Sequence, residues 1–481
     1  MKAVFEALAR NARSCPDAIA FRDDQGSVSW KDLTARVADL AHRLQNAPAT
    51  IGIGLAGGID YVVADLAIAL TGRRQVPLPF FFSAAQNAHI LLDADIGAII
   101  SRDPAVFATV PQVRVIDPDF SGGTRMIQTY RGGAERVIYT SGSTGHPKGV
   151  IIGDRQLDAS LRALSRVIGA GPADRHLSIL PLAQLLEQIC GIFLPILAGA
   201  ETVFRSKATK ALFGEPIDAL SAAFDEVRPT TSLLAPALLG RWVADLSARG
   251  ERAPPSLRFV AVGGASAAPA LVENATSLGI PIHEGYGLSE CCAVVAMNRP
   301  GDSVAGTVGR VLDELDVRLV NGEITVAGPT VMMGYLNGEA APARWHTGDL
   351  GHFVGARLVI EGRKDALLVT GAGRTISPEW VEQRVLADLR VVSAALGLRK
   401  ADGALVLIVV TSAPISRDDI AEAVADLPSF ARPAELILTD PTEPDLLYPA
   451  GTPNRAVAQA LIDTRKAVPL KAPMDLESIA S

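Results

Sequence analysis

Cysteine is scarce in this chain of 481 residues, which contains only Cys15, Cys190, Cys291 and Cys292. None of the four has the paired spacing of a zinc site, and two adjacent cysteines make a poor disulfide framework. The seven histidines are scattered, with no HExxH sequence and no other paired ligand spacing. These absences argue against a zinc centre and against a disulfide-stapled secreted fold, and they favour a reducing, cytoplasmic setting.

Clusters of basic residues and long apolar runs are missing as well. The net charge is -7, so the chain lacks the clustered Lys and Arg that a nucleic-acid-binding face requires. The most apolar stretch, residues 190–200, is too short to cross a bilayer and contains Pro195. Near the N-terminus, Glu6 and Arg10 stand where a signal peptide needs an apolar core. We therefore expect no nucleic-acid partner and no integral membrane span.

The length and the hydrophobic content of 48% indicate two or more domains with sizeable cores. Strand-like apolar runs alternate with helical periodicity, which favours a layered α/β fold. Residues 29–44 repeat Leu33, Val37, Leu40 and Leu44 at helical spacing. Residues 51–55 and 257–262 are predicted as buried strands of this fold, and residues 61–70 as a helix.

The composition changes in the last third of the chain. Residues 317–320, 323–326 and 358–360 are short strand candidates separated by Asn-Gly and Gly-Pro turns, which indicates a small β subdomain. Beyond Glu361, helices are expected at residues 378–389 and 417–427, with a strand at 405–410 between them. The sequence thus predicts a large N-terminal α/β domain over residues 1–361 and a small C-terminal α+β domain over residues 362–481.

Residues 139–150, Tyr-Thr-Ser-Gly-Ser-Thr-Gly-His-Pro-Lys-Gly-Val, form the most informative segment of the chain. Glycines let the backbone fold tightly around a polyanion, while hydroxyls, backbone N–H groups and a lysine can bind phosphate oxygens. The spacing differs from the Walker sequence, so this is a different kind of phosphate loop. Its candidate phosphate ligands are Thr140, Ser141, Gly142, Ser143, Thr144, Gly145 and Lys148.

Five further motifs follow in a fixed order. They are Gly263-Gly264-Ala265, Gly285-Tyr286-Gly287-Leu288-Ser289-Glu290, Trp345-His346-Thr347-Gly348-Asp349-Leu350, Gly362-Arg363-Lys364-Asp365 and Gly371-Ala372-Gly373-Arg374. Each motif alone is a weak signal, because isolated tyrosines, turn aspartates and surface arginines are common. Their joint order is informative.

Together with the phosphate loop, these motifs resemble those of the adenylate-forming superfamily of acyl-CoA synthetases, adenylation domains and luciferases. The resemblance runs from about residue 28 to about residue 462 and is closest to the fatty acyl-CoA synthetases. It implies an enzyme that activates a carboxylic acid with ATP to an acyl-AMP, releasing pyrophosphate. The acyl group then passes to a thiol, most often coenzyme A or the pantetheine of an acyl carrier protein.

The resemblance also implies roles for individual residues. Adenine would lie between the segment Gly263, Gly264, Ala265 and the segment Gly285, Tyr286, Gly287. Ser289 would reach the α-phosphate, Asp349 the ribose hydroxyls, and Arg363 the ribose or phosphate. Glu290 would help to hold Mg²⁺, a hard cation that prefers carboxylate and phosphate oxygens.

Carboxylate attack on a phosphate joins two anions, so catalysis requires charge neutralisation and in-line positioning. Lys148, Glu290 and Arg363 are the candidate catalytic residues. By the resemblance, the hinge of a mobile C-terminal domain lies at Lys364 or Asp365. Gly371 and Gly373 would line the path of the thiol after the domain moves.

The segment 180–188, Leu-Pro-Leu-Ala-Gln-Leu-Leu-Glu-Gln, resembles the border of the acyl pocket in fatty acyl-CoA synthetases. Gln184 and Leu185 are its candidate pocket residues. A neutral Gln184 disfavours an amino-acid substrate, because a buried ammonium needs a charged partner, although Glu187 leaves that option open. A medium or long fatty acid is the expected substrate, while chain length and the choice between aliphatic and aryl acids stay open.

Position 452 departs from the family, which usually has a lysine there that reaches the reacting carboxylate. Here the stretch reads Gly451-Thr452-Pro453-Asn454-Arg455. Loss of one such charge typically costs about 3 kcal/mol or more of transition-state stabilisation, roughly a 100- to 1000-fold loss in rate. Lys466 or Lys471 could substitute, the enzyme could adenylate slowly or favour a transfer step, or the chain could be a degenerate binder.

The sequence therefore predicts an AMP-forming acid–thiol ligase that uses ATP, Mg²⁺ and coenzyme A. Transfer of the acyl group to a carrier protein, an amine or a hydroxyl is an alternative on the same fold. A nucleotide or acyl binder without catalysis is the alternative from another class.

Overall fold

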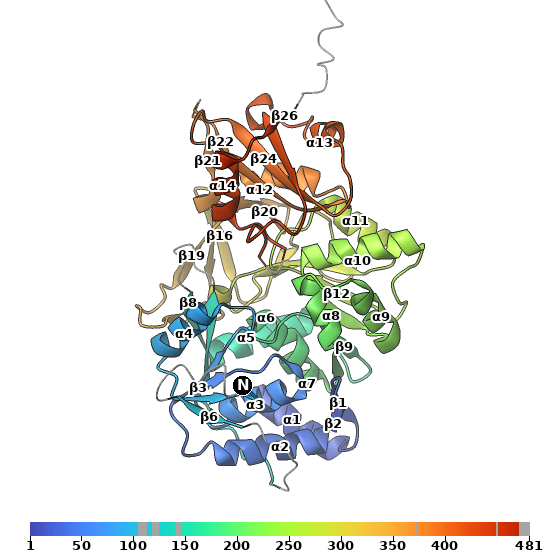
Figure 1. Cartoon of the computed structure of the whole chain (residues 1–481). Coiled ribbons are helices and arrows are strands. Elements are labelled where there is room, and N and C mark those ends of the chain that lie inside the picture. Colours follow the sequence, from blue (N-terminus) through green and yellow to red (C-terminus); the bar gives the residue numbers. More distant parts are fainter. Residues whose placement is uncertain (104–112, 118–124, 141–146, 372, 449–450, 471–481) are drawn as a thin grey trace, which may run out of the picture.

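In the computed structural model, two large sheets and their covering helices form the body of the molecule (Figure 1). The structure describes residues 1–103, 113–117, 125–140, 147–371, 373–448 and 451–470. The described helices are α1 (Lys2–Ser14), α2 (Trp30–Arg43), α3 (Gly58–Leu70), α4 (Ala84–Asp93), α5 (Asp154–Ile168), α6 (Leu185–Gln188), α7 (Leu194–Ala198), α8 (Ser206–Lys210), α9 (Asp218–Val227), α10 (Pro236–Arg249), α11 (Pro269–Ser277), α12 (Pro378–Val385), α13 (Arg417–Ala423) and α14 (Arg455–Thr464).

The larger sheet has thirteen strands. In spatial order they are β16 (Asp316–Val320), β17 (Glu323–Ala327), β19 (Arg344–Val354), β20 (Arg357–Arg363), β15 (Arg310–Val311), β14 (Ala296–Met297), β13 (Ile282–Tyr286), β12 (Phe259–Val262), β11 (Thr231–Leu234), β9 (Arg175–Ser178), β10 (Glu201–Phe204), β1 (Ile19–Arg22) and β2 (Ser27–Ser29). The strands from β13 to β1 are parallel neighbours. Their carboxyl ends share one edge, which is where open α/β sheets bind ligands.

The second sheet has seven strands and carries the phosphate-loop motif. Its order is β18 (Gly334–Tyr335), β8 (Lys148–Gly153), β7 (Glu135–Thr140), β4 (Arg74–Pro77), β3 (Thr50–Ile53), β5 (Ala98–Ile100) and β6 (Arg114–Ile116). Strands β7 and β8 pair antiparallel, with Thr140 opposite Lys148. The motif is therefore the connection of a hairpin, and the sheet fixes both of its ends.

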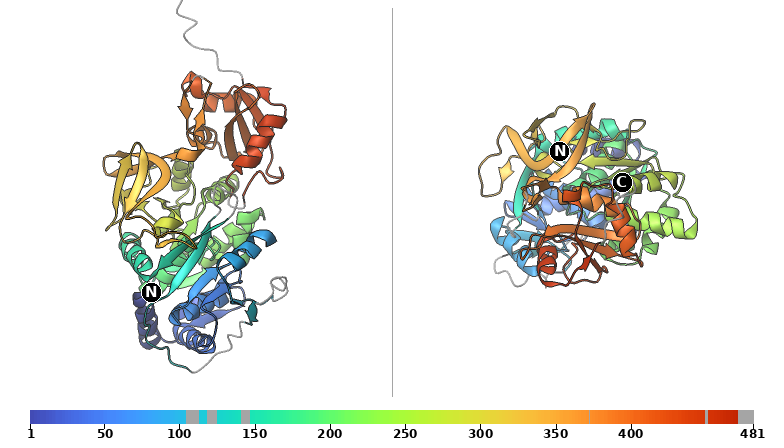
Figure 2. Two further views of the ribbon diagram at one scale, coloured as in Figure 1. Left: turned by 90° about the vertical axis from the view of Figure 1, so that its left-hand side faces the viewer. Right: turned by 90° about the horizontal axis from the view of Figure 1, so that it is seen from above.

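The C-terminal residues form two smaller sheets. These are β21 (Leu368–Val369) with β22 (Thr375–Ile376), and β23 (Val391–Leu398), β24 (Leu405–Thr411), β25 (Glu435–Thr439) and β26 (Val468–Pro469). Two apolar clusters pack around the four-stranded sheet, and the buried members of both lie beyond residue 375. This part lies at the opposite end of the molecule from α1, α2 and α3 (Figures 1 and 2). The predicted boundary between residues 361 and 362 falls inside β20, and the mobility of residues 362–481 stays a prediction.

The expected elements are present, and their ends differ for local reasons. Ser29 caps α2, since its hydroxyl accepts the backbone N–H of Asp32, so the helix starts one residue after the predicted start. The helix predicted at residues 378–389 ends at Val385, and the one predicted at 417–427 ends at Ala423. Among the described residues, no helix has the length and apolar character to cross a membrane.

Candidate active site

A single cleft of about 1140 Å³ collects most of the predicted site residues. The predicted residues in its walls are Thr140, Gln184, Leu185, Gly263, Gly264, Ala265, Gly285, Tyr286, Gly287, Ser289, Asp349 and Arg363. Lys148, Glu290, Lys364, Asp365, Gly371 and Gly373 are described but are not part of the lining. The loop residues Ser141, Gly142, Ser143, Thr144 and Gly145 lie outside the described residues. The functional roles of all these residues stay predictions.

Two parallel strands deliver the glycine motifs to the cleft. Gly263 and Gly264 follow β12, and Gly264 has a φ of +87°, a conformation that favours glycine. Gly287 follows β13, where a side chain would meet backbone, since an added Cβ would lie 1.8 Å from the carbonyl oxygen of Ala293. A flat ring can approach the backbone closely at Gly264, where an added Cβ would have no neighbour within 4 Å, whereas Gly287 makes room for the backbone of Ala293.

Tyr286 and Asp349 form the centre of a hydrogen-bonded chain across the cleft. The Tyr286 hydroxyl donates to Asp349 Oδ2 over 2.6 Å, and Arg363 Nη1 donates to Asp349 Oδ1 over 3.1 Å. Burial raises the pKa of Asp349, while its bonds with Tyr286 and Arg363 oppose this shift. Burial and the neighbouring Asp349 carboxylate also raise the pKa of Tyr286, which keeps the phenol as a donor.

Arg363 is fixed by its own strand and by the residues that follow it. Strand pairing sets Arg363 opposite Asp349 across β19 and β20. The Arg363 guanidinium also donates to Thr347 O over 3.2 Å and to both oxygens of Asp365. Asp365 and Asp349 raise the pKa of Arg363, and the guanidinium lowers the pKa of Asp365. Lys364 points elsewhere, because its ammonium donates to Glu323 Oε2 over 3.1 Å.

Lys148 and Glu290 meet at a common neighbour, Tyr335. The Lys148 ammonium lies 5.6 Å from the Tyr335 ring centroid, and the Tyr335 hydroxyl donates to Glu290 Oε1 over 2.8 Å. The described residues contain no group of three or more potential metal ligands. A lone carboxylate nevertheless fits Mg²⁺, which proteins usually bind through one or two carboxylates together with substrate phosphates.

Glu284 also lines the cleft, and it was not predicted from the sequence. Its side chain is buried on β13, and one of its carboxylate oxygens, Oε2, has no hydrogen-bond partner among the described residues. Burial raises the pKa of Glu284 from 4.5 to about 8, so at neutral pH the group is mostly an uncharged acid that can donate and accept. A glutamate inside a short, mostly buried strand, two residues before Tyr286, was the signal that could have indicated it.

The apolar end of the cleft is built by α6 and the short π-helix Ile189–Phe193 that follows it. Leu185, Leu186 and Cys190 line it, together with Leu164, Ile168, Leu180 and Leu233 from neighbouring elements. Glu187 does not line it; this fully buried side chain accepts a hydrogen bond from the Ser178 hydroxyl. The option of an ammonium partner at Glu187 is therefore not supported by its placement.

The C-terminal part closes one side of the cleft. Gly451 and Thr452 are in the lining, and an added Cβ on Gly451 would lie only 2.5 Å from Ala237 Cβ on α10. Leu386 and Leu389 pack against the main core of the body. Lys466 is exposed beyond the end of α14 and does not line the cleft, while Lys471 lies outside the described residues.

Arg455 also lines the cleft and is the cation nearest in sequence to Thr452. Its guanidinium binds both oxygens of the buried Glu382 and lies 3.1 Å from Glu379 Oε1. Since two carboxylates already hold it, Arg455 is poorly placed to replace the lysine that the family resemblance implies at position 452.

Comparison with known proteins places this geometry in context. The family described as AMP-binding enzyme matches residues 8–336. The 2-succinylbenzoate–CoA ligase of Bacillus licheniformis is 26% identical over 423 residues, which cover 81% of this chain and 85% of that protein. The o-succinylbenzoate CoA synthetase from Bacillus subtilis, solved with the acyl-adenylate intermediate, has a TM-score of 0.80 at 23% identity and covers 96% of this chain and 99% of that one. An anthranilate CoA ligase in complex with anthranoyl-AMP has a TM-score of 0.84 at 19% identity, and the match covers 96% of this chain and 97% of that one. These structures share the fold, which confirms the predicted α/β architecture.

Proposed function

This chain belongs to the AMP-binding enzyme family, and from that premise we propose that it is an ATP-dependent acid–thiol ligase. It would join a carboxylic acid to AMP with release of pyrophosphate, and then transfer the acyl group to a thiol, with coenzyme A as the first candidate. One observation carries the proposal. The Tyr286–Asp349–Arg363 chain and an apolar pocket occupy the same cleft, with Thr140, Gly287 and Ser289 also in its lining.

The nucleotide would lie along the edge formed by β12 and β13. Gly263 and Gly264 leave room for the adenine ring, and Tyr286 offers an aromatic face. Asp349 can accept hydrogen bonds from two ribose hydroxyls, since each carboxylate oxygen has more than one acceptor site. The phosphates would point toward the β7–β8 hairpin, where Thr140 and Lys148 stand opposite each other.

The first half-reaction joins a carboxylate oxygen to the α-phosphorus while the bond to pyrophosphate breaks. Both reactants are anionic, so the chain must supply positive charge and donors at that point. We assign this role to Lys148 and Arg363, with Ser289 as a donor to the α-phosphate. Glu290 would hold Mg²⁺, which neutralises phosphate charge when it is bound.

An acid with an apolar body fits the pocket best. Leu164, Leu180, Leu185 and Leu233 line the far end, so a charged distal group there would lose its hydration. The second carboxylate of a 2-succinylbenzoate-like acid would need a cation. Arg241 lines the cleft, but its guanidinium already donates to the backbone carbonyls of Ala211 and Glu215. A medium or long fatty acid, or an aryl monocarboxylic acid, is therefore the proposed substrate class.

Thr452 supports a second candidate function. This residue lines the cleft where the resemblance implies a lysine, so the described part of the site has one positive charge fewer than that pattern. A chain with this lining could bind ATP and an acid but adenylate very slowly. A carrier-protein thiol, an amine or a hydroxyl as acyl acceptor is compatible with the same first step.

Pyrophosphate release with a panel of fatty and aryl acids, measured with and without coenzyme A, tests the proposal. Turnover with at least one acid, with formation of its coenzyme A thioester, is the expected result. Tight binding of Mg-ATP without pyrophosphate under any condition would instead establish the binder. Pyrophosphate and acyl-AMP without thioester would point to another acceptor.

A further inference from the structure

Behind the apolar end of the cleft lies a second, much smaller cavity of about 30 Å³. Among the described residues, three line both spaces: Ile168, Cys190 and Ala261. These three residues therefore form the partition between the acyl pocket and the small cavity. Two of them come from elements with little freedom to move, since Ile168 ends α5 and Ala261 lies inside β12.

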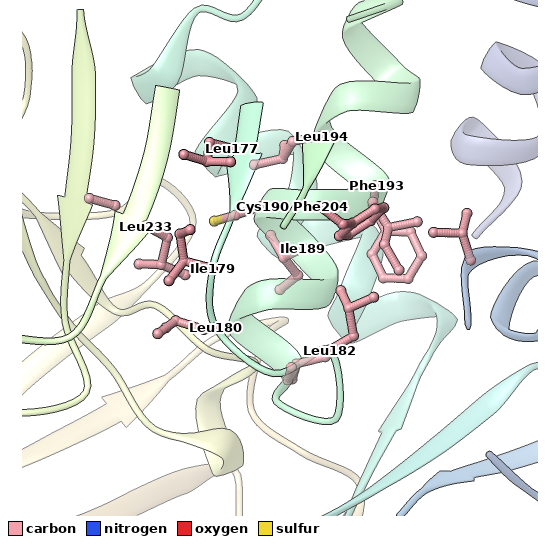
Figure 3. Packing of buried hydrophobic residues seen from close by; sticks show 14 of the residues in the cluster. Leu177, Ile179, Leu180, Leu182, Ile189, Cys190, Phe193, Leu194, Phe204 and Leu233 are labelled. Carbon is pink, nitrogen blue, oxygen red and sulfur yellow. The ribbon is translucent and has the colours of Figure 1, made fainter. Parts of the chain in front are cut away.

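Cys190, the third residue of this partition, belongs to the π-helix that follows α6. It is the second residue of the π-helix Ile189–Phe193, and single π-turns of this kind are frequent at functional sites. Figure 3 shows the Cys190 side chain among Leu177, Leu194 and Leu233. Its residue exposure is 9%, so the thiol is enclosed by protein on most sides.

The turn that carries Cys190 is anchored on both sides. Gln188 accepts a hydrogen bond from Arg136 over 2.6 Å and donates to Leu182 O over 2.9 Å. Glu187 accepts from Ser178, and an added Cβ on Gly191 would come within 3.0 Å of Glu187 Oε1. A partition held this firmly cannot move aside for a longer ligand without breaking buried hydrogen bonds.

Both sides of the partition are largely apolar. Leucines line the cleft side, and the small cavity is lined mainly by Ala170, Leu194, Pro195, Ala200 and Phe259, with Asp174, His176, Thr231 and Ser232 as its polar residues. His176 Nδ1 lies 3.0 Å from the Thr231 hydroxyl, and its Nε2 makes no hydrogen bond among the described residues. An apolar chain that ended in the cleft would enter a mainly apolar space if the partition were opened.

From this arrangement we propose that Cys190 is the floor of the acyl pocket and sets the length of the acid that the enzyme accepts. The inference rests on the proposed function, because it assigns the apolar end of the cleft to the acyl group. Burial and the nearby Glu187 raise the pKa of the Cys190 thiol, so it remains a neutral, compact wall and not a nucleophile. Loss of its sulfur would join the two spaces and admit about one more methylene group.

The test compares Cys190→Ala with Cys190→Leu, using kcat/KM for two series of acids. One series is unbranched fatty acids of increasing length, and the other is benzoic acids with para-alkyl groups of increasing length. Cys190→Ala should move the optimum to longer acids, with a gain of about fourfold for each methylene that becomes buried. Cys190→Leu should move the optimum in the opposite direction.

Two controls separate the floor from a general packing effect. Cys190→Ser keeps nearly the same volume and should retain the length optimum. Ile192→Val removes one methyl group from the same π-helix, at a buried position that lines neither cavity, and should also retain it. Thermal unfolding of each variant shows whether it is folded. If Cys190→Ala or Cys190→Leu does not fold, the shift of the length optimum in the other variant tests the proposal.

The outcomes distinguish this inference from the proposed function. If none of the acids in either series supports pyrophosphate release by the wild-type enzyme, the proposed ligase activity is wrong. If the wild type is active but its length optimum is unchanged in every folded variant of Cys190, the floor lies elsewhere. A shift that Ile192→Val reproduces would also overturn the assignment to Cys190.

Discussion

The Tyr286 hydroxyl and Asp349 Oδ2 are joined by a 2.6 Å hydrogen bond between β13 and β19, two strands that lie far apart in the sequence. Arg363 binds the other oxygen of the same carboxylate. Asp349 is thus held from two sides, and its position relative to the tyrosine ring is fixed. Such preorganisation suits the proposed role of this site, which is to bind a base and a ribose at the same time.

Asp349→Asn should weaken nucleotide binding more than Tyr286→Phe. The asparagine loses the charge and one acceptor oxygen, and hydrogen bonds to charged groups are worth about 1.5–3 kcal/mol, or roughly 10- to 150-fold in affinity. The phenylalanine keeps the aromatic face and loses one hydrogen bond, so a change of less than about tenfold is expected. Calorimetric titration with AMP and with Mg-ATP measures both. Equal affinities in wild type and Asp349→Asn would remove Asp349 from the nucleotide site.

Gly287 and Gly285 belong to one motif but differ in the space around them. An added Cβ on Gly287 would lie 1.8 Å from Ala293 O, whereas one on Gly285 would have its nearest neighbour at 3.5 Å. Gly287→Ala must displace backbone, so we expect it to lower the free energy of unfolding by about 2–4 kcal/mol. Gly285→Ala is the matched control and should change it by less than about 1 kcal/mol. Urea denaturation compares the two, and similar losses would contradict the close approach at Gly287.

Glu284 should make the stability of the protein depend on pH. Burial raises its folded-state pKa from 4.5 to about 8, so between these values the folded state holds a proton that the unfolded state has released. The contribution of Glu284 to the free energy of unfolding is fully present below about pH 4.5, and it declines as the pH rises toward about 8. The total loss across this window is on the order of a few kcal/mol.

Glu284→Gln removes this titration while keeping a similar shape. The free energy of unfolding of the wild type should therefore fall relative to the variant between pH 5 and pH 8, and the difference should level off above pH 8. Denaturation curves for both proteins at several pH values measure it. A constant difference between the two proteins would mean that Glu284 ionises normally.

Much of this site could be predicted from the sequence because its motifs are local. The residues of the β7–β8 connection already indicated a phosphate loop, and the strand register pairs Thr140 with Lys148 at its two ends. Gly263 and Gly264, which the resemblance placed beside adenine, likewise lie in the cleft lining after β12. Local backbone requirements of this kind leave a signature in the sequence.

The remaining features depend on long-range packing. The pairing of β7 with β4, and of β18 with β8, brings together segments that the sequence keeps far apart. The role proposed for Cys190 follows from a π-turn and from a cavity behind it, and neither has a sequence signature. The role of Glu187 also depended on packing, since its contact with Ser178 turns it away from the cleft. Side-chain direction in a buried helix is set by its neighbours and not by local spacing.

Thr452→Lys should accelerate the adenylation half-reaction. Thr452 lines the cleft on a loop that packs against α10, so a longer cationic side chain at this position can reach toward the reacting groups. One well-placed charge is worth about 3 kcal/mol of transition-state stabilisation at best, and we expect an increase of roughly 10- to 100-fold in the rate of acid-dependent pyrophosphate exchange. Thr452→Met is the matched control, because it adds length without charge and should give no acceleration.

Lys466→Ala decides whether another lysine already performs this role. Lys466 is exposed beyond α14 and does not line the cleft, so its removal should leave the pyrophosphate exchange rate within about twofold of wild type. A loss of activity in Lys466→Ala, with no gain in Thr452→Lys, would show that the C-terminal part adopts a different arrangement during adenylation. The positive charge would then reach the carboxylate from Lys466, and the conformation described here would not be the one in which the first half-reaction occurs.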